Sequence, residues 1–236
     1  MPKVLVITPV KDSIDTTLQT IEAIHQADGD LLHVVYNDFS SAENRRILEN
    51  KKAGFGYELV NLEDLTQTPS PNYNLVLQLA QKKALELQIP LVVVESDVLV
   101  KKNTIGKMIE LNEGIKNCGM LGAITTDESG QVNFPYLNFK NVKKEIIKTS
   151  HSLSFCCTLL SVELLKSFSF AELSSEKHWY DVFISRKSIA LGFKNYLVTA
   201  LPVVHKPHSS RPWKQLKYTN PIKYYFNKLV KRKDRI

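Results

Sequence analysis

The sequence predicts an α/β fold in which a mixed, mainly parallel sheet is flanked by helices. Strand-length apolar segments alternate with segments whose apolar residues recur at helical spacing, which indicates βαβ units. One of these strands, Val92-Val93-Val94, shows no polar alternation, as expected for a strand buried on both faces. A length of 236 residues suits one large domain or two closely joined halves.

The first half of the chain predicts four strands and two helices. The strands are expected at 4–9, 31–36, 57–62 and 92–94, and the helices at 14–24 and 76–87. Asp12 or Ser13 can cap the first helix, and Pro90 stops the second. The segment 37–41, Asn-Asp-Phe-Ser-Ser, is typical of a turn.

The second half is less regular. Helices are expected at 105–115 and 179–191, and strands at 120–124, 154–160 and 196–204. Gly192 is placed to end the later helix, and the last strand leads into His205. The polar, turn-rich segment 126–150 is expected to loop over an active site.

Bulk properties are those of a soluble globular protein. No apolar run approaches the ~20 residues of a membrane-spanning helix. The apolar N-terminus is too short for a signal peptide and is interpreted as the first strand. The three cysteines, Cys118, Cys156 and Cys157, are expected to be reduced core thiols of a cytoplasmic protein rather than a metal or redox site.

The positive charge is concentrated in a tail, residues 209–236. This tail holds 9 of the 31 Lys and Arg residues and 1 of the 24 acids, which leaves 22 bases and 23 acids elsewhere. Five of its apolar residues fall on one face of a helix: Ile222, Tyr225, Phe226, Leu229 and Val230. We expect a basic amphipathic helix that contacts an anionic membrane surface through 211–236. Packing on the globule or on a partner subunit is the alternative, and nucleic acid ranks lower because the body is not basic.

Two acids follow the buried strand at 92–94. Glu95 and Asp97 lie at its carboxyl end, where open α/β sheets bind ligands. Carboxylates suit a hard divalent cation and, through it, a diphosphate. A merely solvated strand end is the alternative.

Asp181 and His205 are the other candidates for chemistry. Asp181 opens a predicted helix, where it could act only as a cap or could serve as a general base beside a cleft. His205 would share an edge of the sheet with Glu95 and Asp97 if both strands are parallel. A neutral imidazole there could complete a metal shell, although a purely structural histidine is commoner.

In combination these segments resemble family 2 glycosyltransferases, which have the Rossmann-like GT-A fold. The resemblance covers most of residues 1–208. It rests on the opening strand Val4–Val10, the turn Val35–Ser41, the acid block Val94–Val98, and the block from Trp179 to His205. Asp181 precedes Gly192 by 11 residues and Gly192 precedes His205 by 13, which suits the family pattern.

The resemblance implies a metal-dependent, inverting transfer of sugar from a nucleoside-diphosphate sugar to a hydroxyl. Asp181 would be the catalytic base, and Asp97 and His205 would bind Mn²⁺ or Mg²⁺. The nucleotide-binding residues would be Thr8, Pro9, Val10, Asn37, Asp38, Glu95 and Ser96. Three positions depart from the family pattern: Asn37 and Glu95 each replace an Asp, and Tyr180 replaces the Glu before the catalytic acid.

These inferences give one catalytic domain, 1–208, followed by the tail 209–236. Within the domain, 1–100 would bind the nucleotide and 101–208 the acceptor. The acceptor would be a surface glycan or a lipid-linked glycan. The protein would be cytoplasmic, and its tail would attach it to the inner face of the membrane. The alternative is a non-catalytic sugar-nucleotide-binding or membrane-associated interaction protein on a transferase scaffold.

Overall fold

The computed structural model describes residues 1–174 and 179–206. Its strands are β1 (Val4–Val10), β2 (Leu31–Asn37), β3 (Glu58–Asn61), β4 (Leu91–Val94), β5 (Val98–Leu99), β6 (Cys118–Thr126), β7 (Ile146–Thr149), β8 (Cys157–Leu160) and β9 (Lys194–His205). Its α-helices are α1 (Ile14–His25), α2 (Ala42–Phe55), α3 (Tyr73–Leu87), α4 (Thr104–Gly114), α5 (Val162–Ser167) and α6 (Tyr180–Ala190). Short 3₁₀ turns are η1 (Leu62–Asp64), η2 (Leu137–Phe139) and η3 (Phe170–Glu172).

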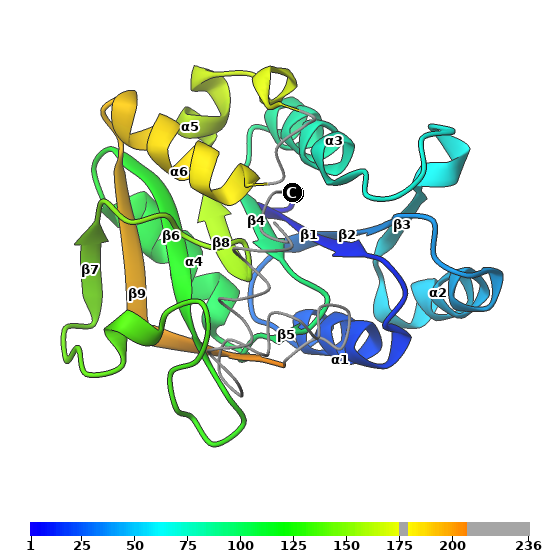
Figure 1. Ribbon diagram of the computed structural model, residues 1–236, viewed down its shortest axis with the longest axis horizontal. Coiled ribbons are helices and arrows are strands. Elements are labelled where there is room, and N and C mark those ends of the chain that lie inside the picture. The colour runs from blue at the N-terminus through cyan, green and yellow to red at the C-terminus, as the bar shows by residue number, and fades with distance from the viewer. Residues whose placement is uncertain (175–178, 207–236) are drawn as a thin grey trace, which may run out of the picture.

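The nine strands of these described residues form one mixed sheet. Their order is β3-β2-β1-β4-β8-β6-β9-β5, with β7 also paired to β9 (Figure 1). β1, β2, β3, β4, β6 and β9 run in one direction, and β5, β7 and β8 run in the other. The expected α/β fold with a mixed, mainly parallel sheet is therefore confirmed.

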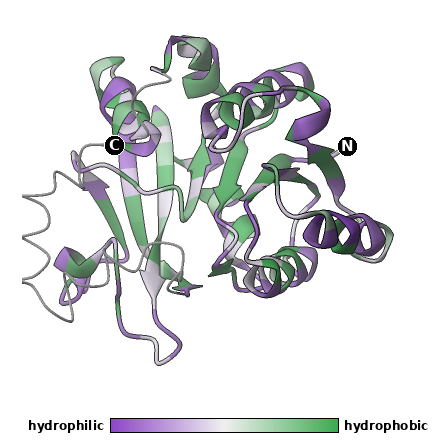
Figure 2. Ribbon diagram, turned by 45° about the vertical axis from the view of Figure 1, so that its right-hand side comes forward, coloured by the Kyte–Doolittle hydropathy of each residue, from purple (hydrophilic) through white to green (hydrophobic). Residues whose placement is uncertain are grey.

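Both faces of the central strands are buried. Alternate residues of β1 enter different cores, since Leu5 and Ile7 pack in one cluster and Val4 and Val6 in another. The first cluster includes residues of α3, α5 and α6, and the second includes residues of α1 and α4. Each such side chain contributes about 1.5–3 kcal/mol on full burial. Figure 2 shows hydrophobic strands at the centre and helices banded with both colours around them.

Helix α2 is absent from the sequence expectations. Its 14 residues include only one that is buried, Leu48, so no apolar stripe marks it. The residues at its two ends are the sequence signals that could have identified the helix. The Ser41 hydroxyl accepts a hydrogen bond from the Asn44 backbone N–H, and Gly56 follows the helix with φ of 65°.

The segment 126–150 is not the continuous loop that was expected. It contains η2 and the short strand β7, which pairs antiparallel with β9 from Ile146 opposite Val198 to Thr149 opposite Asn195. The mixed polar composition of this segment hides the strand because only one face of it is covered.

Strand β9 contains a bulge. Ala123 of β6 lies opposite Val198, but the next residue, Ile124, lies opposite Pro202. The extra residues 199–201 leave the β6 pairing, and the backbone N–H groups of Thr199 and Ala200 both donate to the Glu145 carbonyl. The bulge sets the register in which β9 reaches its end at His205.

The sheet passes through both expected halves of the catalytic domain, because β4 pairs with β8. The division at residue 100 remains a prediction. The basic tail 209–236 lies outside the described residues, so its helix remains a prediction too. Within 1–174 and 179–206, none of the helices has the length and apolar character needed to cross a membrane.

Candidate active site

The acid pair and the histidine meet where β4 and β9 end. After β4 the chain turns at Glu95, whose carbonyl accepts a hydrogen bond from the Val98 N–H, and then forms β5. β5 pairs antiparallel with the end of β9, so that Val98 lies opposite His205. The Lys206 N–H donates to the Asp97 carbonyl at 2.9 Å. The expectation that His205 shares an edge of the sheet with Glu95 and Asp97 therefore matches the geometry.

Asp97 and His205 form a close pair. The His205 Nε2 atom lies 3.3 Å from Asp97 Oδ2, and Asp97 is 1% exposed. His205 Nδ1 lies 2.8 Å from the Phe134 carbonyl, which can only accept, so the Nδ1–H donates there and Nε2 faces Asp97. Burial alone would lower the pKa of His205, but the hydrogen bond and charge of Asp97 outweigh it and raise that pKa.

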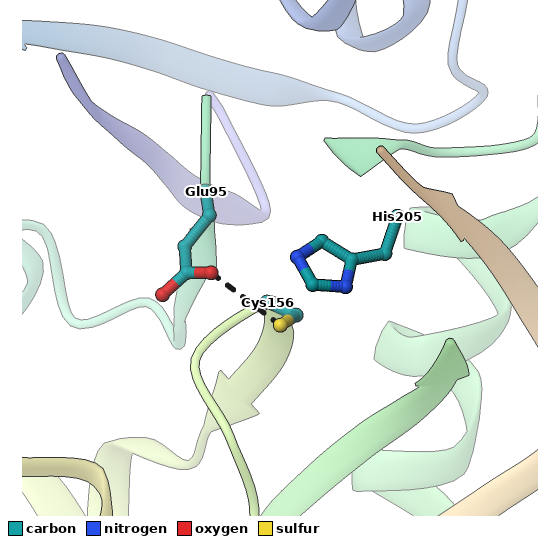
Figure 3. Close-up of side chains that lie close together, drawn as sticks. All are labelled: Glu95, Cys156 and His205. Atoms are coloured by element: carbon teal, nitrogen blue, oxygen red, sulfur yellow. Dashed lines mark hydrogen bonds between the residues drawn. The ribbon is translucent and has the colours of Figure 1, made fainter. Parts of the chain in front are cut away.

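Glu95 and Cys156 contact each other beside the imidazole of His205 (Figure 3). The Cys156 thiol donates to Glu95 Oε2 at 3.4 Å, and the Glu95 backbone N–H donates to the Cys156 carbonyl at 3.0 Å. One donor atom from each of Glu95, Cys156 and His205 lies within 4.8 Å of the others (Figure 3). Burial, and next the charge of Asp97, raise the pKa of Glu95 to about 7.

Asp181 lies in the first turn of α6. One carboxylate oxygen accepts from the Val182 N–H at 2.8 Å, which is a helix-start interaction. Burial is the main cause of the raised pKa of Glu95 and of Tyr73, and the charge of Asp181 adds to it, which indicates that Asp181 lies near both residues. Helix α6 thus brings Asp181 to the strand ends that carry Glu95.

Tyr180, which stands where the family has a Glu, is part of the core. It is 3% exposed and its ring lies 6.0 Å from that of Tyr73. The substitution exchanges an acid for packing that fixes the first turn of α6 against α3. It leaves the neighbouring Asp181 directed at the acidic cluster.

Tyr73 is a site residue that sequence reasoning missed. It opens α3, and burial, followed by the charges of Glu95 and Asp181, raises its pKa well above the ordinary value. Among the described residues no hydrogen-bond partner is found for its buried hydroxyl. Such a group costs about 1–3 kcal/mol unless a ligand satisfies it. Its position before the apolar stripe of α3 gave no sequence signal.

The residues expected to bind the nucleotide lie at the ends of β1 and β2 and directly after β2 and β4. The Asp38 carboxylate accepts three hydrogen bonds, from the Ser70 hydroxyl and from the backbone and side-chain N–H groups of Asn72, all at 2.8 Å. Asp38 therefore holds the segment that leads into α3, and its Oδ1 atom, which accepts only one of these bonds, retains further acceptor capacity.

The other expected nucleotide residues are largely buried. Asn37 donates to Asn61 Oδ1 and accepts from the Ser40 N–H, and the Thr8 hydroxyl lies 3.0 Å from His33 Nε2. Val10 and Ser96 are buried, and Pro9 is half-buried. These side chains tie the loops together at the carboxyl edge, and their binding roles remain predictions.

The cluster has donor atoms that suit a divalent cation. Asp97 and Glu95 offer carboxylate oxygens, and in the neutral imidazole the contact with Phe134 holds the proton on Nδ1, which leaves the lone pair of His205 Nε2 available to a cation. A ligand histidine commonly has its other ring nitrogen fixed by a carbonyl in this way. The residues present therefore fit the metal that the resemblance implies.

The topology, the buried acid-histidine pair and the helix-start acid can now be compared with known structures. The fold matches the S. aureus protein TarS in complex with UDP-GlcNAc with a TM-score of 0.67 and 16% identity over 88% of this chain. It matches the mannosyltransferase PcManGT from Pyrobaculum calidifontis, in complex with GDP-Man and Mn²⁺, with a TM-score of 0.65 and 14% identity over 98% of this chain. It matches GalNAc-T7 with UDP, GalNAc and Mn²⁺ with a TM-score of 0.62 and 12% identity over 87% of this chain.

The chain has the GT-A glycosyltransferase fold. Its GT-A fold spans 59% of the TarS chain, 64% of the PcManGT chain and 44% of the GalNAc-T7 chain. No protein-family model and no curated protein match the sequence. The likeness to GT-A proteins is therefore carried by the three-dimensional structure.

Proposed function

We propose that this chain is a family 2 glycosyltransferase that transfers sugar from a nucleoside-diphosphate sugar to an acceptor hydroxyl with inversion. One observation carries the proposal: Glu95, Asp97, Asp181 and His205, which come from three separate segments of the chain, gather at the carboxyl edge of a GT-A sheet, where Asp97 pairs with His205 and the charges of Asp97 and Asp181 both act on Glu95. The sugar nucleotides in the TarS and PcManGT structures support a donor of this class.

Asp181 acts on the acceptor. Its carboxylate takes the proton of the acceptor hydroxyl as that oxygen bonds to the anomeric carbon. The bond from the anomeric carbon to the diphosphate oxygen breaks on the opposite face, which inverts the configuration. The Val182 backbone N–H donates to the Asp181 carboxylate and so holds it at the start of α6.

Asp97 and His205 would hold Mn²⁺ or Mg²⁺, and the bound ion would neutralise charge on the departing diphosphate. The Mn²⁺ in the PcManGT and GalNAc-T7 structures supports such an ion. We assign Glu95 to the donor side of the cluster, near both Asp97 and Asp181, whose charges add to burial in raising its pKa. The part of the site that binds the nucleoside would be shaped by the loops that six residues hold: Thr8, Pro9, Val10, Asn37, Asp38 and Ser96.

The test is Asp181→Asn, assayed with a panel of nucleoside-diphosphate sugars, Mn²⁺ and candidate acceptors. We expect transfer to fall by about 10²–10⁴-fold, while donor binding measured by calorimetry stays unchanged. Asp64→Asn, at an exposed acid that pairs with Arg45, is the matched control and keeps full activity. Full activity of Asp181→Asn would contradict the assignment of Asp181 as the general base. Donor binding without turnover by the wild type would favour the non-catalytic alternative.

The acceptor proposal is a surface glycan or lipid-linked glycan, with the protein at the inner face of the membrane. It rests on the sequence of the tail, whose bases could each add about 1 kcal/mol of attraction to an anionic surface. Sedimentation with anionic liposomes, before and after removal of 211–236, tests it. Unchanged sedimentation of the shortened chain would contradict this part of the proposal.

A further inference from the structure

Cys156 lies inside the acidic cluster rather than in a purely apolar core. It lies in the turn directly before β8. The Cys156 sulfur is 3.4 Å from Glu95 Oε2 and 3.3 Å from the Ser154 hydroxyl. Cys157, the next residue, is fully buried and pairs with Val94 in the sheet. The two neighbouring thiols therefore have different surroundings.

The sulfur is close to the atoms that would bind a cation. Glu95, Cys156 and His205 each offer a donor atom within 4.8 Å of the others, and Figure 3 shows the thiol between the carboxylate and the imidazole. In a tetrahedral site with metal–ligand bonds of 2.0–2.3 Å, ligand atoms are separated by about 3.5 Å. The donor atoms of the three groups would need to approach one another by up to about 1.3 Å, which side-chain rotation can supply. His205 Nε2 already lies 3.3 Å from Asp97 Oδ2.

We propose that Cys156 is a sulfur ligand of this cation site, which makes it an oxygen, nitrogen and sulfur site that takes Zn²⁺ in preference to Mn²⁺ or Mg²⁺. The inference deepens the metal site of the proposed function and rests on it for the roles of Asp97 and His205. Binding replaces the S–H bond by a metal–sulfur bond and releases one proton to solvent. No change of oxidation state is involved.

The preference follows from the softness of the donors. A thiolate favours Zn²⁺ and its analogues Co²⁺ and Cd²⁺, whereas Mg²⁺ and Mn²⁺ favour carboxylates, carbonyls and water. A site of carboxylates and one histidine has little means of excluding Mn²⁺. Adding Cys156 widens the difference in affinity between Zn²⁺ and Mn²⁺ without changing the position of the site in the fold.

The test uses Co²⁺ alone, titrated into the full-length protein and followed by absorption spectroscopy. Visible bands report the geometry of bound cobalt, and a near-ultraviolet charge-transfer band reports a cobalt–thiolate bond. We expect both in the wild type and loss of the charge-transfer band in Cys156→Ala. Competition titration should show Zn²⁺ affinity falling by at least ~10–100-fold in that variant, as befits loss of a direct ligand, with Mn²⁺ affinity nearly unchanged.

Cys157→Ala is the matched control and keeps the charge-transfer band, because its sulfur lies outside the cluster. Cys156→Ser preserves the size of the side chain, so it provides the same measurement if Cys156→Ala fails to fold by circular dichroism. Visible bands without a charge-transfer band would show that cobalt binds without a thiolate. That outcome would contradict the assignment of Cys156 as a ligand and would not contradict the proposed function. Absence of cobalt binding, or a band that persists in both Cys156 variants, would also overturn it. If the protein shows the cobalt–thiolate band but transfers no sugar, the Cys156 metal site is supported and the proposed function is contradicted.

Discussion

Tyr73 brings a hydroxyl group into the acidic cluster without a protein partner among the described residues. A ligand hydroxyl or phosphate oxygen could provide the missing hydrogen bond. The side chain would then contribute to binding or positioning a substrate while contributing nothing to folding through its oxygen.

We therefore expect Tyr73→Phe to keep or slightly raise the free energy of unfolding in urea and to lower kcat/KM by about tenfold, equivalent to ~1.4 kcal/mol. Tyr57→Phe is the matched control, because the Tyr57 hydroxyl donates to the Leu48 carbonyl at 2.5 Å. It should lose about 1 kcal/mol of stability and keep its activity. A clear loss of stability in Tyr73→Phe would show that its hydroxyl has a structural partner.

His33 predicts a dependence of stability on pH. Burial lowers its pKa from 6.5 to about 3, so the folded protein keeps this ring neutral across most acidic conditions. Between those values the unfolded chain binds a proton that the folded chain does not, and stability falls as the pH falls. The contribution is about 1.4 kcal/mol per pH unit below pH 6.5.

Urea unfolding of wild type and His33→Gln between pH 4 and 8 measures this contribution as the difference between two slopes. The variant should lose less stability on acidification than the wild type. Parallel curves would mean that the folded protein can protonate His33, for example by opening the contact with Thr8.

At the scale of elements, Gln81 joins α3 to the segment that carries η3. Its side-chain amide donates to the carbonyls of Leu165 and Phe168 and accepts from the Phe170 N–H at 2.7–2.8 Å. All of these bonds are buried. They fix the chain between α5 and η3 against α3, on the face of the sheet where α6 also packs.

Gln81→Leu keeps the approximate volume but leaves three buried backbone groups without these bonds. We expect a loss of about 2–4 kcal/mol in urea unfolding. Gln78→Leu, one turn earlier on α3, removes only a bond to the Asn74 side chain and should stay within about 0.5 kcal/mol of the wild type. Equal effects of the two variants would contradict the role assigned to Gln81.

The sequence predicted the elements whose apolar pattern is strong. The continuous run of β4 and the stripe of α3 were identifiable because burial on one or both faces dictates their composition. Helix α2 and strand β7 were not, because few of their side chains are buried. Antiparallel β8 was predicted as a strand, but its direction depends on contacts with β4 and β6 that no local pattern encodes.

The same limit applies to the site. The sequence could predict that Glu95, Asp97 and His205 lie close together, because parallel strands present their carboxyl ends at one edge of the sheet. Cys156 and Tyr73 could not, because Cys156 lies in the turn before an antiparallel strand and Tyr73 lies in the first turn of a helix. Cysteine and tyrosine are also common in hydrophobic cores, so only the position of these two residues beside Glu95 in the structure identifies them as site residues.

At the scale of the whole molecule, a bound cation should stabilise the fold. Asp97, in the turn after β4, and His205, at the end of β9, are more than 100 residues apart in sequence, so an ion held between them joins the middle of the described chain to its end. Binding to the folded state alone adds about 2.7 kcal/mol when the ion is present at 100 times its Kd.

Thermal unfolding with and without MnCl₂, after removal of metal with a chelator, measures this linkage. The wild type should gain several degrees in Tm, and Asp97→Ala should gain nothing. Glu43→Ala, at an exposed acid on α2, should respond as the wild type does. A shift that survives in Asp97→Ala would place the stabilising ion elsewhere.

The bulge in β9 has a consequence for how the chain can vary in length. Residues 199–201 stand outside the pairing with β6, whereas 202–204 are paired with it and lead directly to His205. One residue inserted among 199–201 can be accommodated by a larger bulge, and the imidazole keeps its place beside Asp97. One residue inserted between Pro202 and His205 would turn the imidazole to the opposite face of the sheet. Two insertions only a few residues apart should therefore have opposite outcomes, one tolerated and one that removes the imidazole from the site.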